Sequence, residues 1–222
     1  MSQLVALLKT MRPKQWIKNA FVFGALVFDV KFFDPTYLWQ SILGFLLFSL
    51  ISGVVYTLND LVDIEKDRAH PKKRYRALPS GELSPRVAQI AVVVIAGAAL
   101  LLGAWLSTGF ALILGGYLVL QITYSFVLKN VVLLDVMAIA AGFVLRVAAG
   151  VPLVDAERFS PWLYICTTLL ALFLALGKRR GELVLLGAEA GRHRESLNHY
   201  TVPLLDQLVS LVTWSTILAY AP

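Results

Sequence analysis

The chain has 222 residues, of which 58% are hydrophobic and 15% are charged. Soluble domains are usually about 45–50% apolar and about 25% charged, so this composition excludes an ordinary soluble domain and indicates a membrane protein. The net charge of +6 does not predict nucleic-acid binding, because the basic residues gather at the ends of apolar segments, as is typical of membrane proteins.

Seven apolar segments are candidate membrane-spanning helices, for which about 17–25 residues are enough. The first, at roughly residues 17–33, is the weakest, because Lys18 and Asn19 lie within it. The other six lie at roughly 37–58, 85–106, 109–128, 131–150, 161–177 and 203–220. The sequence therefore predicts an all-α, polytopic transmembrane helix bundle, and we expect residues 1–222 to form a single domain.

The positions of the basic residues predict the orientation of this bundle. Seventeen of the 20 Lys and Arg residues lie in the N-terminal segment or in the loops after the second, fourth and sixth apolar segments. Since cytoplasmic loops carry an excess of these residues, we expect a cell-membrane protein whose N-terminus is cytoplasmic. The loops after the second and sixth segments are also the long ones, so the functional surface is expected to face the cytoplasm.

The loop after the second segment combines acids and bases, in the sequence LNDLVDIEKDRAHPKKRYRALP. On a continuous helix, Asp60, Asp63 and Asp67 would lie within about 60° of one another, whereas Glu65 would point to a different side. Carboxylates on a shared face suit Mg²⁺, and the amide oxygen of Asn59 could join them. The spacing predicts a metal site formed by Asn59, Asp60, Asp63 and Asp67.

Basic side chains follow these acids within ten residues, namely Arg68, His70, Lys72, Lys73, Arg74 and Arg76. Arginine binds phosphate oxygens with two nitrogens and lysine adds a point charge, so acids and bases together would suit a diphosphate carried with its metal. The other interpretation is that the bases only hold the loop in the cytoplasm, with the acids as their solvated partners. Asn59 and Asp60 argue against it, because polar groups at the end of an apolar helix are costly without a purpose.

At these residues the sequence resembles the UbiA superfamily of intramembrane prenyltransferases, whose signature NDxxDxxxD is present as Asn59, Asp60, Asp63 and Asp67. A narrower resemblance is to the decaprenyl-phosphate phosphoribosyltransferase branch, which has three motifs in the same order as this chain. They are RPxQWxKN from Arg12, the extended loop pattern NDxxDxxxDxxHPxKRxR, and GKRxxEL from Gly177.

The resemblance implies a membrane-embedded, Mg²⁺-dependent transferase. Members of this branch transfer 5-phosphoribose from 5-phosphoribosyl 1-diphosphate to a polyprenyl phosphate and release diphosphate, which supplies arabinose donors for the cell envelope. The alternative is transfer of a prenyl group from its diphosphate to an aromatic or other small acceptor. A transporter or a non-catalytic scaffold is less favoured, because the charges lie at the cytoplasmic edge of the spans and not at mid-membrane.

The sequence departs from the superfamily in two ways. The loop after the sixth segment begins GKRRGEL where the superfamily has a second aspartate-rich motif, and a basic loop suits two phosphate-bearing substrates. The family also usually has nine helices, so we expect this chain to lack the last two.

The remaining candidate substrate-binding residues are basic or polar side chains near the cytoplasmic ends of the spans. The loop after the second segment, here called the motif loop, contributes Lys73, Arg74 and Arg76. The other predicted substrate-binding residues are Lys14, Lys18, Asn19, Tyr124, Lys129, Lys178, Arg179 and Glu182. The lysines could equally serve as interfacial anchors or topology charges. Asp135 is expected to face a polar cavity or to pair with a base such as Lys129. A basic stretch at residues 192–194 suggests a patch for anionic lipid headgroups.

Overall fold

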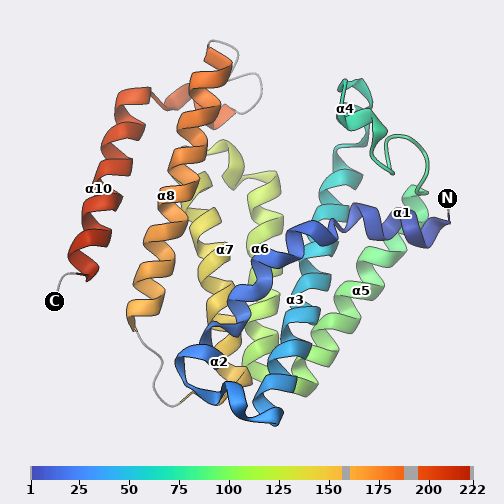
Figure 1. Cartoon of the computed structure of the whole chain (residues 1–222). Helices are drawn as coiled ribbons and strands as arrows, with labels where there is room; N and C mark the ends of the chain where they lie inside the picture. The colour runs from blue at the N-terminus through green and yellow to red at the C-terminus, as the bar shows by residue number, and fades with distance from the viewer. Residues whose placement is uncertain (1, 157–160, 188–194, 221–222) are drawn as a thin grey trace. The chain divides into compact units, whose positions relative to one another are not determined.

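The computed structural model describes residues 2–156, 161–187 and 195–220, and the secondary structure of this described part is helical (Figure 1). The chain divides into two compact units. Unit 1 comprises Met1–Leu118 and Ala148–Ala156, and unit 2 comprises Val119–Val147 and Glu157–Pro222. Two helices, α6 (Thr108–Phe126) and α7 (Leu134–Gly150), have residues in both units.

Unit 1 is built around the helix α3 (Pro35–Val62), which packs against α5 (Pro85–Leu106). Both helices begin with proline, whose fixed φ suits the first helical position. The Asp34 side chain caps α3 by accepting the Thr36 N–H at 2.8 Å. The other helices of unit 1 are short: α1 (Gln3–Thr10), η1 (Pro13–Phe23), α2 (Gly24–Phe28), η2 (Lys31–Phe33), α4 (Ile64–Ala69), η3 (Lys73–Tyr75) and η5 (Val151–Leu153).

The N-terminal chain, blue in Figure 1, runs beside α3 and packs tightly in unit 1. One close approach is at Gly150, where a Cβ atom would lie 2.1 Å from the backbone oxygen of Val22. Glycine is therefore required here by packing and not by backbone conformation. The contact fixes the end of η1 against the stretch that precedes η5.

Unit 2 is organised around the contact between α8 (Pro161–Leu186) and α10 (Val202–Tyr220). The short helices η4 (Leu128–Asn130) and η7 (Glu195–His199) complete it. Its core includes Val136, Leu176, Leu197 and Leu205.

In the described part of the chain, six helical segments are long and apolar enough to span a membrane. They are Pro35–Val62, Pro85–Leu106, Thr108–Phe126, Leu134–Leu153, Pro161–Leu186 and Val202–Ala219. These six agree with the sequence-based expectation, and the polytopic all-α fold is confirmed.

The expected span at 17–33 differs, because this segment is divided among η1, α2 and η2. Its polar residues explain the division: Asn19 forms buried hydrogen bonds to α3, and Asp29 ends α2. The 3₁₀ helix η1 rises about 2 Å per residue, so the segment still extends far along α3.

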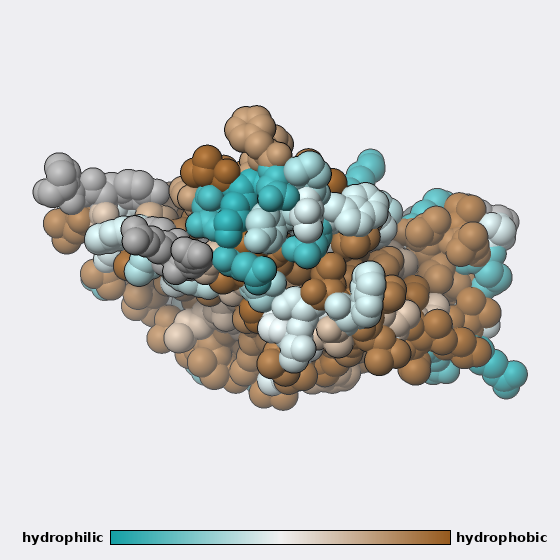
Figure 2. Space-filling view, turned by 90° about the horizontal axis from the view of Figure 1, so that it is seen from below, coloured by the Kyte–Doolittle hydropathy of each residue, from teal (hydrophilic) through white to brown (hydrophobic). Residues whose placement is uncertain are grey.

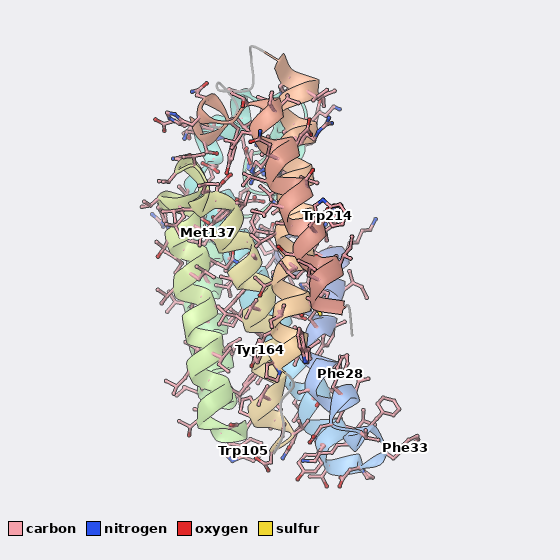
Figure 3. The ribbon with its side chains drawn as sticks, turned by 90° about the vertical axis from the view of Figure 1, so that its left-hand side faces the viewer. Phe28, Phe33, Trp105, Met137, Tyr164 and Trp214 are labelled. Carbon is pink, nitrogen blue, oxygen red and sulfur yellow. The ribbon has the colours of Figure 1, made fainter. Side chains whose placement is uncertain are left out.

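Many large apolar side chains are exposed, including Trp105 and Phe33 of unit 1 and Trp214 and Met137 of unit 2 (Figure 3). Figure 2 shows hydrophobic residues, in brown, around a smaller hydrophilic area. Water would disfavour exposed apolar area on this scale, whereas the hydrocarbon of a bilayer accommodates it. The surface therefore agrees with a multi-pass membrane protein.

Candidate functional site

The first part of the candidate site is a buried carboxylate at the end of α3. Asp60 is 3% exposed, and its Oδ1 accepts hydrogen bonds from Arg12 Nη2 at 2.7 Å and from Arg76 Nη1 at 3.1 Å. Arg12 is the residue before η1, in a left-handed conformation with φ of 52°, and its guanidinium lies 4.8 Å from the ring centre of Tyr56. The two arginines neutralise a charge that would otherwise be costly to bury.

A second buried carboxylate meets the same arginine. Asp67 of α4 is 2% exposed and accepts a hydrogen bond from Arg76 Nη1 at 2.7 Å, while Lys73 Nζ lies 3.6 Å from its other oxygen. A single guanidinium nitrogen therefore bridges Asp60 and Asp67. The two carboxylates converge on one cation position.

Asn59 and Asp63 lie at the break between α3 and α4, and both are half-buried. Asp63 ends α3, and its N–H donates to the Asn59 carbonyl at 3.0 Å. The helix is therefore interrupted at Asp63, between α3 and α4, although Asp60 and Asp67 on either side of the break still meet the same arginine. Among the described residues, no three acid, histidine or cysteine side chains lie close enough together to hold a metal ion.

The donor chemistry of this region nevertheless fits a hard cation. Its side chains offer carboxylate and amide oxygens, which are the ligands that Mg²⁺ prefers. Asp60 and Asp67 already direct oxygens to one point, where Arg76 supplies the positive charge. These residues are therefore suited to bind a cation, with Arg76 as the group that would have to move.

A small cleft of about 130 Å³ adjoins Asp60. Three bases line it together with other residues of unit 1, and its lining is Lys9, Thr10, Arg12, Asp60, Tyr75, Arg76, Ala77 and Glu82. Arg12 belongs to the RPxQWxKN motif but was not predicted as a site residue, and Lys9 was missed. The one available signal was that Arg12 stands in the same motif as Lys14 and Lys18.

The N-terminal helix is tied to the loop that carries Arg76. The side chain of Gln3 donates to the Glu82 carbonyl at 3.0 Å and accepts the Ser84 N–H at 2.9 Å. These two bonds hold α1 beside the loop that follows η3, so that both can contribute to the cleft.

The other predicted residues of unit 1 lie in different surroundings. Lys14 and Lys18 are exposed, whereas Asn19 is 1% exposed and forms hydrogen bonds with Ser49 at 3.1 Å and Ser52 at 3.2 Å. Asn19 therefore holds η1 against α3. Arg74 is exposed and donates to the neighbouring Tyr75 hydroxyl at 2.6 Å, whereas Lys73 and Arg76 meet the buried acid Asp67.

In unit 2, Asp135 near the start of α7 is fully buried and has several partners. Its Oδ2 accepts from Arg179 Nε at 2.7 Å and from Ser196 Oγ at 3.2 Å, and its Oδ1 accepts from the Tyr200 hydroxyl at 2.7 Å. The expectation that Asp135 pairs with a base is confirmed, but that base is Arg179 and not the suggested Lys129. Ser196 and Tyr200 were missed, since no sequence pattern links them to Asp135.

The environment of Tyr200 fixes the direction of its hydrogen bonds. Burial and the hydrogen bond to Asp135 raise the pKa of the Tyr200 hydroxyl above its usual value of 10.0. The hydroxyl therefore stays protonated as a donor to Asp135, and its oxygen accepts the Leu133 N–H at 2.8 Å.

The GKRRGEL motif lies at the end of α8, and its side chains differ in their exposure. Arg179 is 1% exposed and also donates through Nη1 to Glu182 at 2.7 Å. Lys178 is exposed, with its ammonium 3.9 Å from the other oxygen of Glu182. Tyr124 in α6 and Lys129 in η4 are half-buried in the same unit. The suggested lipid patch at residues 192–194 falls outside the described residues.

Comparisons with known proteins agree with these features. A model of the UbiA prenyltransferase family matches residues 20–179. The decaprenyl-phosphate phosphoribosyltransferase of Mycolicibacterium smegmatis is 32% identical over 218 residues, which cover 96% of this chain and 68% of that protein. The enzyme of the same name from Mycobacterium tuberculosis is 33% identical over 225 residues, which cover 99% of this chain and 74% of that protein.

A solved structure shows the same fold. It is a UbiA homologue from Archaeoglobus fulgidus bound to DMAPP and Mg²⁺, which superimposes with a TM-score of 0.78 at 20% identity. The match covers 96% of this chain and 75% of that one. Together with the family model and the mycobacterial relatives, this fold shows that the chain belongs to the UbiA prenyltransferase family, a family of membrane-embedded transferases.

Proposed function

We propose that the protein transfers 5-phosphoribose from 5-phosphoribosyl 1-diphosphate to a decaprenyl-like polyprenyl phosphate and releases diphosphate. The observation that carries the proposal is the pair of buried carboxylates, Asp60 and Asp67, that converge on Arg76 among further bases. A diphosphate bound with a divalent cation needs this combination of acids and bases. The M. smegmatis relative, a decaprenyl-phosphate phosphoribosyltransferase at 32% identity, supports this choice of substrates.

The proposed reaction does not require proton transfer by a protein residue. An oxygen of the acceptor phosphate attacks C1 of the ribose, the bond from C1 to the diphosphate oxygen breaks, and diphosphate leaves with the bonding electrons. Because the phosphate is already an anion, no general base is required. The residues have to bind and orient two phosphate-bearing molecules and stabilise the leaving charge.

We assign these tasks to the residues of the motif loop, to Arg12, and to other polar residues of the two units. Asn59, Asp60, Asp63 and Asp67 would hold Mg²⁺, which would neutralise charge on the leaving diphosphate. Arg76, Lys73 and Arg12 would bind phosphate oxygens. Lys14, Lys18 and Arg74, which are exposed in unit 1, are further candidates for substrate contacts. So are Tyr124, Lys129, Lys178 and Glu182 of unit 2.

We also infer that residues 1–222 form one UbiA-type domain, since the family model matches residues from both units. We place it in the cell membrane with a cytoplasmic N-terminus, because the bases concentrate in the N-terminal segment and in alternate loops. The polyprenyl tail of the acceptor would lie against the apolar helices, within the hydrocarbon.

A second candidate is transfer of a prenyl group from its diphosphate to a small acceptor. It is favoured by one observation: the A. fulgidus homologue with this fold binds DMAPP, a prenyl diphosphate, together with Mg²⁺. The metal and diphosphate chemistry would be the same, and the transferred group would differ.

Radiolabelled substrates separate the two candidates. Membranes that contain the protein are incubated with 5-phosphoribosyl 1-diphosphate labelled in the ribose, Mg²⁺ and a polyprenyl phosphate, and the lipids are extracted. We expect label in the lipid phase, lost on addition of EDTA and restored by excess Mg²⁺. Consumption of a labelled prenyl diphosphate with no phosphoribose in the lipid would instead select the second candidate.

A further inference from the structure

Unit 2 contains a buried polar cluster that the proposed chemistry does not use directly. Asp135, Arg179, Ser196 and Tyr200 are each at most 3% exposed and are joined by three hydrogen bonds to the Asp135 carboxylate. The cluster links the start of α7, the end of α8 and the segment around η7. It therefore fixes three parts of unit 2 that are distant in sequence.

A buried ion pair of this kind contributes little net stability to the fold. Burying an ion pair costs several kcal/mol per ion in desolvation, and well-packed apolar residues of similar volume are often as stable or more so. What a buried ion pair with additional hydrogen bonds does supply is a defined orientation for each of its groups. The cluster is thus better explained by the fixed orientation of the Arg179 side chain than by a gain in stability.

Arg179 connects the buried cluster to the exposed end of α8. Its Nε donates to Asp135, and its Nη1 donates to Glu182 at 2.7 Å. Glu182 in turn faces the Lys178 ammonium at 3.9 Å, and the Lys178 side chain is 67% exposed. A continuous series of charge pairs runs from a buried carboxylate to an accessible ammonium.

We propose that Asp135 and Arg179 are positioning residues that hold Glu182, and through it the Lys178 ammonium, in place to bind a phosphate group of a substrate. This inference rests on the proposed function, which has two phosphate-bearing substrates. The group bound is a phosphate monoester dianion, either the 5-phosphate of the ribose donor or the phosphate of the lipid acceptor. Arg179 itself does not contact substrate, although its place in the GKRxxEL motif suggested that it would.

The surrounding hydrogen bonds keep Asp135 available for this task. The Tyr200 hydroxyl remains a donor to Oδ1, and its oxygen is occupied by the Leu133 N–H. Ser196 donates to Oδ2 beside Arg179. With both oxygens satisfied, the carboxylate keeps one orientation, and so does the guanidinium paired with it.

The test compares stability with the KM for each substrate in the purified protein. Arg179→Lys keeps the charge but cannot reach Asp135 and Glu182 together, and Lys178→Met removes the ammonium. Each is expected to raise the KM for one substrate about tenfold with a smaller change in kcat, as the loss of one charge-assisted phosphate contact would give. The substrate whose KM rises identifies the source of the phosphate. Lys66→Met, which removes an exposed base on α4, is the matched control.

The decisive measurement is the double variant Lys178→Met with Arg179→Lys. If Arg179 acts through Lys178, the double variant has the same KM as Lys178→Met alone, whereas two independent effects would multiply. Multiplied effects, or an unchanged KM in Arg179→Lys, would overturn the positioning role.

An apolar replacement of the pair checks the same role when single variants fold poorly. Asp135→Leu combined with Arg179→Met removes both charges, and we expect a thermal midpoint close to that of the wild type with a KM still raised about tenfold. A stable double variant with a normal KM for both substrates would make the cluster purely structural. If the wild-type protein transfers no phosphoribose, the proposed function is wrong. If the wild-type protein transfers it and the variants have an unchanged KM, only the positioning role is wrong.

Discussion

At the scale of single residues, the acids of the NDxxDxxxD motif have unequal surroundings. Asp60 and Asp67 are buried and paired with Arg76, whereas Asp63 is half-buried at the break between two helices. Glu65 is exposed and pairs with Arg68 on the same short helix. Four acids that are similar in sequence therefore differ in what their removal should do.

Replacing Asp63 by alanine should reduce activity without unfolding the protein. Asp63 is only half-buried, so we expect the fold to depend on it little, while the proposed metal site needs its carboxylate. We expect kcat to fall at least about a hundredfold, on the order of what one preorganised electrostatic group contributes. The measurement is phosphoribose transfer beside a thermal unfolding curve. Full activity in Asp63→Ala would remove Asp63 from the site, and Glu65→Ala, which should retain activity, is the control.

Replacing Asp60 by alanine should reduce stability as well as activity. The change leaves Arg12 without its carboxylate partner and Arg76 with only Asp67. Donors that lose their partner cost roughly 1–3 kcal/mol, so the thermal midpoint should fall by several degrees. A variant as stable as the wild type would show that the two arginines find other acceptors.

At the scale of elements, the helices follow the hydrophobic pattern but their breaks do not. The apolar run and the prolines at 35 and 85 are enough to predict α3 and α5 from the sequence. The end of α3 at Val62 was not predictable, since the polar residues beyond it also suit a helix. The division of residues 13–33 into short helices depends on Asn19 reaching Ser49 and Ser52, a contact between segments that no local pattern reveals.

The contact between η1 and the chain before η5 can be tested with one glycine. In Gly150→Ala the new Cβ would lie 2.1 Å from a backbone oxygen, so the backbone itself must shift. Overpacking of this kind costs about 1–3 kcal/mol, occasionally more, and should lower the thermal midpoint clearly. Gly97→Ala in α5 is the matched control, because nothing lies within 4 Å of its new Cβ. Equal midpoints for the two variants would contradict the packing described for Gly150.

At the scale of the whole molecule, the chemistry of the site was easier to predict than its geometry. Composition gave the membrane environment, and the order of three motifs indicated the family and the acids of the site. The partners of those acids were mostly not predictable, because Arg12 meets Asp60 across 48 positions and Arg179 meets Asp135 across 44. Pairings over such distances are set by helix packing, which one sequence does not display.

The orientation of the molecule in the membrane can be tested by labelling. With Cys166 replaced by alanine, the chain has no cysteine, so single reporters can be introduced. Phe33→Cys, at a side chain 88% exposed, should react with a membrane-impermeant maleimide in intact cells. Lys66→Cys, in the motif loop, should react only after the membrane is opened. The opposite pattern would place the N-terminus outside the cytoplasm.

The two bonds from Gln3 to residues 82 and 84 have a consequence for the order of events during synthesis. They join positions separated by 79 and 81 residues, so α1 leaves the ribosome well before its partner loop exists. During that interval we expect α1 to bind at the membrane surface, where the exposed side chains of Leu4 and Leu8 can enter the apolar layer. The cleft beside Asp60 can form only after α3 has been inserted and the loop that follows it has been translated. The residues that line this cleft, from Lys9 to Glu82, are thus all translated well before the GKRRGEL segment.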